Sequence, residues 1–182
     1  MRRLARRLPR RIVVALVVAI AIVAVSFTLG VYRVSGDSMR PTLVPGELVL
    51  VERLGPPPGG YALGDLIAFE APAGWETSEP VLVKRLIGLP NDVITIYEGQ
   101  VHRNGLLLDE PYLTPTTGTT LRGRLIGEWL VRPGQYFLLG DNRSPSLDSR
   151  LFGPVDATRI IGRVILPTVD RAAARAEAPA AP

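Results

Sequence analysis

Lys84 is the residue with the clearest capacity for chemistry in this chain. It lies in the apolar stretch "VLVKRLIG" at residues 81–88, and it is the single lysine among 21 basic residues. Arginine keeps its proton in proteins and cannot act as a base, whereas burial can turn a lysine into a neutral amine. A lone lysine in an apolar strand therefore indicates a general base, although a lysine that reaches water from a sheet edge gives the same pattern.

Ser38 is the nucleophile that such a base would activate. It lies in the turn-prone stretch "SGDSMRPT" at residues 35–42, and a serine hydroxyl is a weak nucleophile unless a base lies beside it. His102, the single histidine, is the rival base, but its place beside the hairpin sequence Asn104-Gly105 is typical of an exposed side chain. Serine–lysine pairs are an established variant of the catalytic triad, so Lys84 is the better base.

A third polar stretch, "GDNRSPSLDSRLFGPV" at residues 140–155, follows an apolar run. A solvated loop has the same composition, but loops set on a rigid sheet are also where sites are built. A neutral lysine needs a partner that orients its lone pair without charging it. A serine hydroxyl suits that role, whereas a carboxylate would raise the lysine pKa.

The composition excludes several classes of site. The 182 residues contain no cysteine and one histidine, so neither a disulfide nor a zinc site built from Cys and His is possible. The formal net charge is +4, but six arginines lie in the first eleven residues and the remainder is slightly acidic. We therefore expect no nucleic-acid partner, no metal and no cofactor.

An uncharged apolar segment follows these arginines at residues 12–32. As a helix it would span about 31 Å, close to the hydrocarbon thickness of a bilayer. The arginine-rich residues 1–11 should stay in the cytoplasm, so the chain crosses the cytoplasmic membrane once and the rest lies outside. A signal peptide cleaved after Ala24-Val25-Ser26 is the alternative, but the length of the apolar segment favours an uncleaved anchor.

Short β-type runs bounded by Gly and Pro dominate residues 33–170. They predict an antiparallel, mostly β domain after a single N-terminal helix. Residues 111–127 read as a long excursion, and residues 171–182 as an Ala/Pro-rich tail that frays. Strands are expected at residues 47–53, 65–71, 80–89, 92–99, 135–141 and 160–167.

Three motifs, in this order after the apolar segment, resemble those of bacterial type I signal peptidase, a membrane-bound Ser-Lys endopeptidase. "SMRPT" is similar to the nucleophile motif, "KRLIGLPND" to the lysine motif and "GDNRSPSLDSRLFGPV" to the third motif, while "GDLIAF" at residues 64–69 is a weaker match. The resemblance covers about residues 12–167. It implies a largely β catalytic core with a smaller β insertion, here at about residues 93–134.

The resemblance also assigns roles to particular residues. Ser38 is implied as the nucleophile, Lys84 as the general base and Ser146 as the hydroxyl that orients the lysine. The remaining implied positions are an Asp148–Arg150 ion pair that steadies the third loop, an Arg85–Asp141 ion pair, the oxyanion position Gly36, and substrate pockets from Val34, Met39, Leu43, Leu82 and Val83.

Two departures from the family pattern stand out. Some members have a serine where this chain has Gly36, so here the main-chain N–H of Ser38 must do more to hold the oxyanion. The lysine motif commonly has a glycine where this chain has Asn91. Asparagine is the residue best able to replace glycine at positive φ, so we expect the turn to be kept.

The resemblance implies that the chain removes N-terminal signal peptides from exported preproteins at Ala-x-Ala-type sites. Its partners would then be preproteins and the lipid bilayer. Two other classes remain open. A Ser-Lys autoprotease of SOS-repressor type would need a DNA-binding domain and no anchor. A non-enzymatic, membrane-tethered β module would not explain a lysine in the apolar strand, and it would not react with a serine acylator.

Overall fold

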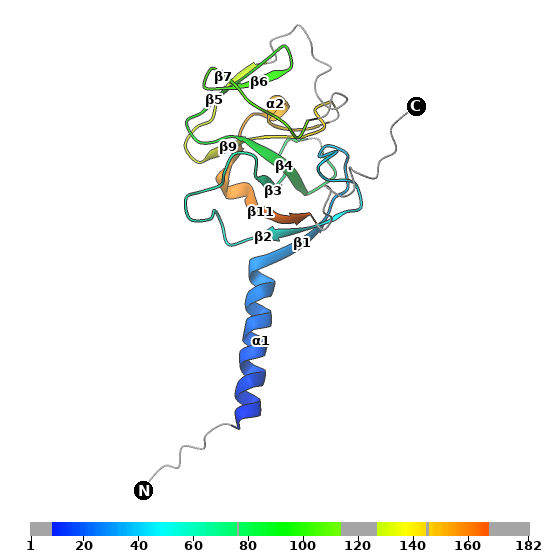
Figure 1. Cartoon of the computed structure of the whole chain (residues 1–182), viewed down its shortest axis with the longest axis vertical. Coiled ribbons are helices and arrows are strands. Elements are labelled where there is room, and N and C mark those ends of the chain that lie inside the picture. Colours follow the sequence, from blue (N-terminus) through cyan, green and yellow to red (C-terminus); the bar gives the residue numbers. More distant parts are fainter. Residues whose placement is uncertain (1–8, 76, 114–126, 145, 168–182) are drawn as a thin grey trace.

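The computed structural model describes residues 9–75, 77–113, 127–144 and 146–167, with the backbone alone at residues 21–26, 166 and 167. These residues form one long helix and two antiparallel sheets, which confirms the expected mostly β fold (Figure 1). Residues 1–8, the tail at 171–182 and most of the excursion at 111–127 lie outside the described residues.

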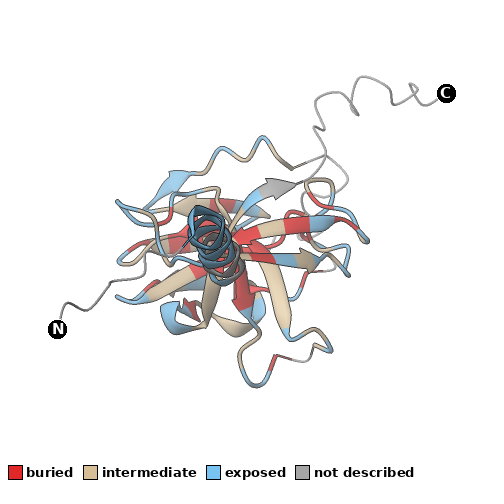
Figure 2. Cartoon of the chain, turned by 90° about the horizontal axis from the view of Figure 1, so that it is seen from below, coloured by how far each residue is buried: buried red, intermediate tan, exposed pale blue. Residues whose placement is uncertain are grey.

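Helix α1 (Arg10–Thr28) extends from the β domain as a rod (Figure 1). Many of its apolar side chains are exposed, among them Ile20 at 67% and Phe27 at 78%. Figure 2 looks along this helix and shows it exposed, while the buried residues gather inside the β domain. In the described part of the chain, no helix combines the length and the apolar character that crossing a membrane requires.

The helix ends four residues before the end of the apolar segment at 12–32, because residues Leu29–Arg33 form strand β1. This strand pairs antiparallel with β2 (Leu48–Glu52). The Arg53 side chain crosses β1 at Gly30, where an added Cβ would lie 2.5 Å from Arg53 Nε. Apolar composition cannot separate the last turn of a helix from a buried strand, so pairing with β2 decides the boundary.

The larger sheet has seven strands in the order β1-β2-β11-β3-β4-β9-β10. Besides β1 and β2 it contains β3 (Leu66–Glu70), β4 (Val81–Gly88), β9 (Gln135–Leu139), β10 (Val155–Asp156) and β11 (Ile160–Pro167). Five of the six expected strands are in this sheet, and the sixth, expected at residues 92–99, is in the smaller sheet. The apolar side chains of the larger sheet form one core around Phe69, Leu86 and Leu138, and another around Val49 and Val51. A short helix, α2 (Ser149–Phe152), and the 3-10 turn η1 (Ala157–Arg159) complete the fold.

The smaller sheet has four strands in the order β7-β6-β5-β8: β7 (Leu106–Leu107), β6 (Gln100–Arg103), β5 (Val93–Tyr97) and β8 (Gly127–Leu130). Its core residue Ile94 packs with Phe137 and Leu139 of β9, which joins the two sheets. Two turn predictions are confirmed. Asn104 and Gly105 have φ of 52° and 80° in the β6–β7 hairpin, and Asn91 has φ of 74° before β5.

Candidate active site

Ser38 and Lys84, 46 residues apart in the sequence, meet at the larger sheet. Lys84 lies on β4, directly opposite Ile67 of β3. Its side chain is only 2% exposed, and Nζ donates a hydrogen bond to Ser38 Oγ. Ser38 lies in the turn that connects β1 to β2. Since successive side chains of a strand point to opposite faces, Lys84 points toward Ser38 while its neighbour Arg85 points away.

Burial lowers the pKa of Lys84 to about 8, from the ordinary 10.5 of a lysine. Desolvation is the largest cause, because a low-dielectric environment penalises the ammonium form. The Asp148 carboxylate raises the pKa of Lys84, the Arg150 guanidinium lowers it and the Asp141 carboxylate raises it. The desolvation outweighs the two carboxylates, so the amine is close to neutrality at moderately basic pH.

The third-motif loop (residues 140–155) holds the backbone of the nucleophile loop (residues 35–42) in place. The Asn142 backbone N–H donates to the Ser38 carbonyl oxygen at 2.9 Å, and Asn142 Nδ2 donates to the Asp37 carbonyl oxygen at 3.2 Å. Gly140 allows this close approach, because an added Cβ would lie 2.6 Å from the Ser38 carbonyl oxygen and 2.2 Å from Ser146 Oγ. The position of Ser38 therefore depends on residues about 100 positions later in the chain.

Ser146 Oγ lies close to Gly140 in the third-motif loop and is not bonded to the pair. Its side chain is 5% exposed, and Oγ forms no hydrogen bond with Lys84 or with any other described residue. A buried hydroxyl without a partner is costly, since it has lost its water. The lysine-orienting role expected for Ser146 stays a prediction.

Asp148 and Arg150 form an ion pair with an Nε–Oδ1 distance of 2.8 Å. Asp148 caps the N-terminus of α2 by accepting from the Arg150 backbone N–H, and it also accepts from the Gly140 N–H at 3.0 Å. Arg150 Nη2 donates to the Arg143 carbonyl oxygen at 2.6 Å. Together these bonds close the third-motif loop on itself.

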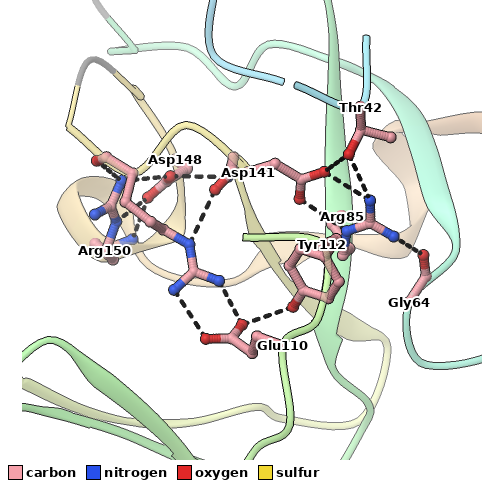
Figure 3. Close-up of polar contacts among 10 residues, drawn as sticks. Thr42, Gly64, Arg85, Glu110, Tyr112, Asp141, Asp148 and Arg150 are labelled. Atoms are coloured by element: carbon pink, nitrogen blue, oxygen red, sulfur yellow. Dashed lines mark hydrogen bonds and ion pairs between the residues drawn. The ribbon is translucent and has the colours of Figure 1, made fainter. Parts of the chain in front are cut away.

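Arg85 and Asp141 also form an ion pair, on the other face of β4 (Figure 3). Arg85 Nε and Nη2 donate to the two Asp141 oxygens at 2.7 and 2.6 Å, and Nη1 donates to the Gly64 carbonyl oxygen at 2.8 Å. The Thr42 hydroxyl donates to the same Asp141 carboxylate. One buried carboxylate thus connects the lysine strand, the nucleophile loop and the third-motif loop.

A cleft of about 540 Å³ opens beside Ser38 and Lys84. Leu43 is not among the residues that line it, and its side chain is fully buried in the core with Val49 and Val51. Gly36 does line it, and an added Cβ there would have no neighbour within 4 Å. The other expected pocket residues that line the cleft are Val34, Met39, Leu82 and Val83.

His102 lies on β6 of the smaller sheet, opposite Thr95 and Leu107, and is not part of the cleft. Within the described residues, no three or more His, Asp or Glu side chains gather in a way that could hold a metal ion.

Sequence reasoning missed several residues that shape the site. Asn142 and Arg143 lie in the third motif, but nothing in their pattern separated them from a solvated loop. Glu110 and Tyr112 fall at the start of the long excursion and carry no motif. Gly140 showed no signal of its close contact, since that contact exists only once the loops are packed.

Three comparisons relate this chain to known proteins. The family model "Signal peptidase, peptidase S26" matches residues 6–169. A signal peptidase I from Bacillus caldolyticus is 40% identical over 147 residues, covering 76% of this chain and 78% of that protein. A signal peptidase IB from Staphylococcus aureus is 33% identical over 158 residues, covering 80% of each.

A solved structure of a signal peptidase I from Enterococcus faecalis is 30% identical, with 57% of this chain and 96% of that chain covered and a TM-score of 0.48. The family match and the curated relatives each span most of the chain. They show that this chain belongs to the signal peptidase family, peptidase S26, and is a serine peptidase.

Proposed function

We propose that Ser38 and Lys84 form a Ser-Lys dyad with which this signal peptidase cleaves its preproteins. The observation that carries the proposal is the hydrogen bond between Nζ and Oγ at a lysine that is only 2% exposed. Burial favours the neutral amine, and a neutral amine in contact with a hydroxyl can accept its proton. His102, the rival base, lies on the other sheet.

Lys84 takes the Ser38 proton as Oγ attacks the scissile carbonyl carbon. The tetrahedral intermediate then collapses to an acyl-enzyme. The C–N bond breaks, and the new amino group of the mature protein receives the proton from Lys84. Lys84 next removes a proton from a water molecule, whose oxygen attacks the ester and releases the signal peptide with Ser38 restored. No metal or cofactor takes part.

The developing oxyanion needs donors that are in place before the reaction. We assign this role chiefly to the Ser38 N–H, two residues after Gly36. The bonds from Asn142 to the Ser38 and Asp37 carbonyl oxygens support this assignment, because they fix the orientation of those peptide groups. Ser146 is assigned to orient Lys84, supported by its burial within the third-motif loop.

The substrate is proposed to bind as an added strand along residues 81–84 of β4. In the described residues this part of β4 pairs with β3 alone, because β9 pairs only from Arg85 onward. An unpaired strand edge is a template for an extended peptide. Val34, Met39, Leu82 and Val83 line the cleft there, and we assign to them the pockets for the small residues at −3 and −1 of an Ala-x-Ala-type site.

The apolar helix at residues 12–28 is proposed to anchor the chain in the cytoplasmic membrane, with residues 1–11 inside and the peptidase domain, which begins with strand Leu29–Arg33, outside. The exposed apolar side chains of α1 support this, because a surface such as that of Val14, Val17 and Ile20 is unfavourable in water. Residues 93–134 are proposed as the insertion of this domain, supported by the smaller sheet formed from β5 to β8.

The dyad is tested by cleavage of a purified model preprotein. Ser38→Ala and Lys84→Arg should each lose all processing, because the first removes the nucleophile and the second places a permanent cation where a base is needed. His102→Ala is the matched control and should cleave at the wild-type rate. Substantial turnover by Lys84→Arg, or loss of turnover in His102→Ala, would refute the dyad.

The topology is tested by protease treatment of intact spheroplasts and of inside-out vesicles. The domain should be digested in spheroplasts and protected in the vesicles. The reverse pattern would overturn the proposed orientation. Mass spectrometry of the isolated chain shows in the same samples whether cleavage after Ser26 has removed the anchor.

A further inference from the structure

Glu110 and Tyr112 connect the smaller sheet to the candidate active site (Figure 3). They lie just after β7, in the segment that leaves that sheet. The Glu110 carboxylate accepts hydrogen bonds from Arg143 Nη2 and Nη1, the second at 3.2 Å, and from the Tyr112 hydroxyl at 2.6 Å. The side chains of Arg143 and Glu110 are only 7% and 9% exposed, so this ion pair is shielded from water.

Arg143 belongs to the third-motif loop, so its ion pair with Glu110 links that loop to the segment after β7. Its Nε donates to the Gly140 carbonyl oxygen at 3.0 Å, and its own carbonyl oxygen accepts from Arg150. Gly140 is the residue whose missing side chain lets the loop approach Ser38. A buried guanidinium keeps its position only if its charge is balanced. Glu110 therefore holds the part of the loop that contacts the nucleophile.

Tyr112 carries the contact to the lysine strand. Arg85 Cζ lies 3.9 Å from the centre of the Tyr112 ring, which is cation–π geometry. Arg85 adjoins Lys84 and pairs with Asp141. Burial and the Glu110 carboxylate raise the pKa of Tyr112, so its hydroxyl stays protonated and donates to Glu110.

We propose that Glu110 and Tyr112 are positioning residues of the peptidase. They hold Arg143 and Arg85, and so keep the third-motif loop and Lys84 correctly placed relative to Ser38. This inference rests on the proposed Ser38–Lys84 dyad. The alternative is an ion pair that only fastens the two sheets together. Loss of a purely structural ion pair would change the stability of the fold, whereas loss of a positioning pair changes the turnover of molecules that are fully folded.

The experiment compares full-length variants in detergent micelles, using a fluorogenic peptide with an Ala-x-Ala site. For Glu110→Gln, kcat per folded molecule should fall about tenfold or more, since small misplacements of reacting groups cost that much, and KM should stay within about twofold. Tyr112→Phe, which loses a single hydrogen bond, should lower kcat about threefold. Glu110→Asp restores the charge and should recover part of the loss.

Matched controls come from the same sheet. Glu128→Gln and Tyr97→Phe change exposed residues of β8 and β5 and should leave kcat unchanged. Because Glu110 acts through Arg143, the double variant Glu110→Gln/Arg143→Gln should be no slower than Arg143→Gln alone. The folded fraction of each variant is measured by circular dichroism at the assay temperature.

A wild-type kcat in folded Glu110→Gln overturns the inference, as does a loss that only follows the folded fraction. Additive losses in the double variant overturn it as well. If Glu110→Gln does not fold, Tyr112→Leu decides, because it removes both the hydroxyl and the ring over Arg85, and an unchanged kcat there refutes the positioning role. Ser38→Ala and Lys84→Met, measured in parallel, separate the two proposals. If both are inactive while Glu110→Gln is normal, the dyad stands and the positioning role alone fails.

Discussion

Lowering the pH below 8 should protonate Lys84 and remove the base that the proposed mechanism requires. Desolvation on β4 lowers the pKa of this lysine to about 8, against 10.5 for an ordinary lysine. Only the neutral amine can accept the Ser38 proton. The rate of cleavage should therefore follow the fraction of enzyme in which Lys84 is neutral.

The expected size of the effect follows from the pKa. With a pKa of about 8, the neutral fraction is about 1% at pH 6, about 9% at pH 7 and about 90% at pH 9. With a pKa of 10.5 it would be about 0.03% at pH 7, so burial increases the usable base about 300-fold at that pH. We expect kcat/KM to rise about ninefold between pH 6 and 7, about fivefold between pH 7 and 8, and about 90-fold between pH 6 and 9.

The assay measures kcat/KM of the full-length chain in detergent micelles on a fluorogenic Ala-x-Ala peptide from pH 6 to 10. A single acidic limb with its midpoint near 8 is the expected profile, and His102→Ala should show the same limb. A midpoint near 10.5 would show that burial does not lower the pKa of Lys84. A limb that disappears in His102→Ala would refute lysine as the base.

Three further outcomes follow from the packing. Because the unfolded chain keeps the Lys84 proton between pH 8 and 10.5 while the native chain releases it, native stability should rise with pH in this window. By urea titration, the free energy of unfolding of wild type relative to Lys84→Met should increase by about 2 kcal/mol between pH 7 and 9.5. No increase would refute the buried neutral amine. Gly140→Ala should lower kcat and the thermal midpoint together, because its Cβ would lie 2.2 Å from Ser146 Oγ, whereas Gly36→Ala has free space and should leave the thermal midpoint unchanged. Asp141→Asn should lower the free energy of unfolding by about 3–5 kcal/mol, since it leaves the nearly buried Arg85 guanidinium without its counter-charge. A loss under about 1 kcal/mol by urea titration would show that water already screens the ion pair.

Much of the fold was predictable because local patterns carried it. Val- and Ile-rich runs between Gly and Pro predicted the β strands, and Asn104-Gly105 predicted the hairpin turn, since both depend on conformational preferences of the residues themselves. The end of α1 was not predictable. Residues 29–32 continue the uncharged run of the helix before them, and Leu29–Arg33 becomes a strand because it pairs with β2.

The sequence by itself determined which residues could do the chemistry. One lysine among arginines made Lys84 the candidate base, and the ordered motifs made Ser38 the candidate nucleophile, because these are statements about residue type and order. The tertiary structure decided what surrounds them. It buried Lys84 and so lowered its pKa, brought Asn142 onto the nucleophile loop, and placed Leu43 in the core instead of the cleft. It also brought Glu110 and Tyr112 onto Arg143 and Arg85. Desolvation and charge pairing depend on distances between segments far apart in the chain, and no local pattern encodes those distances.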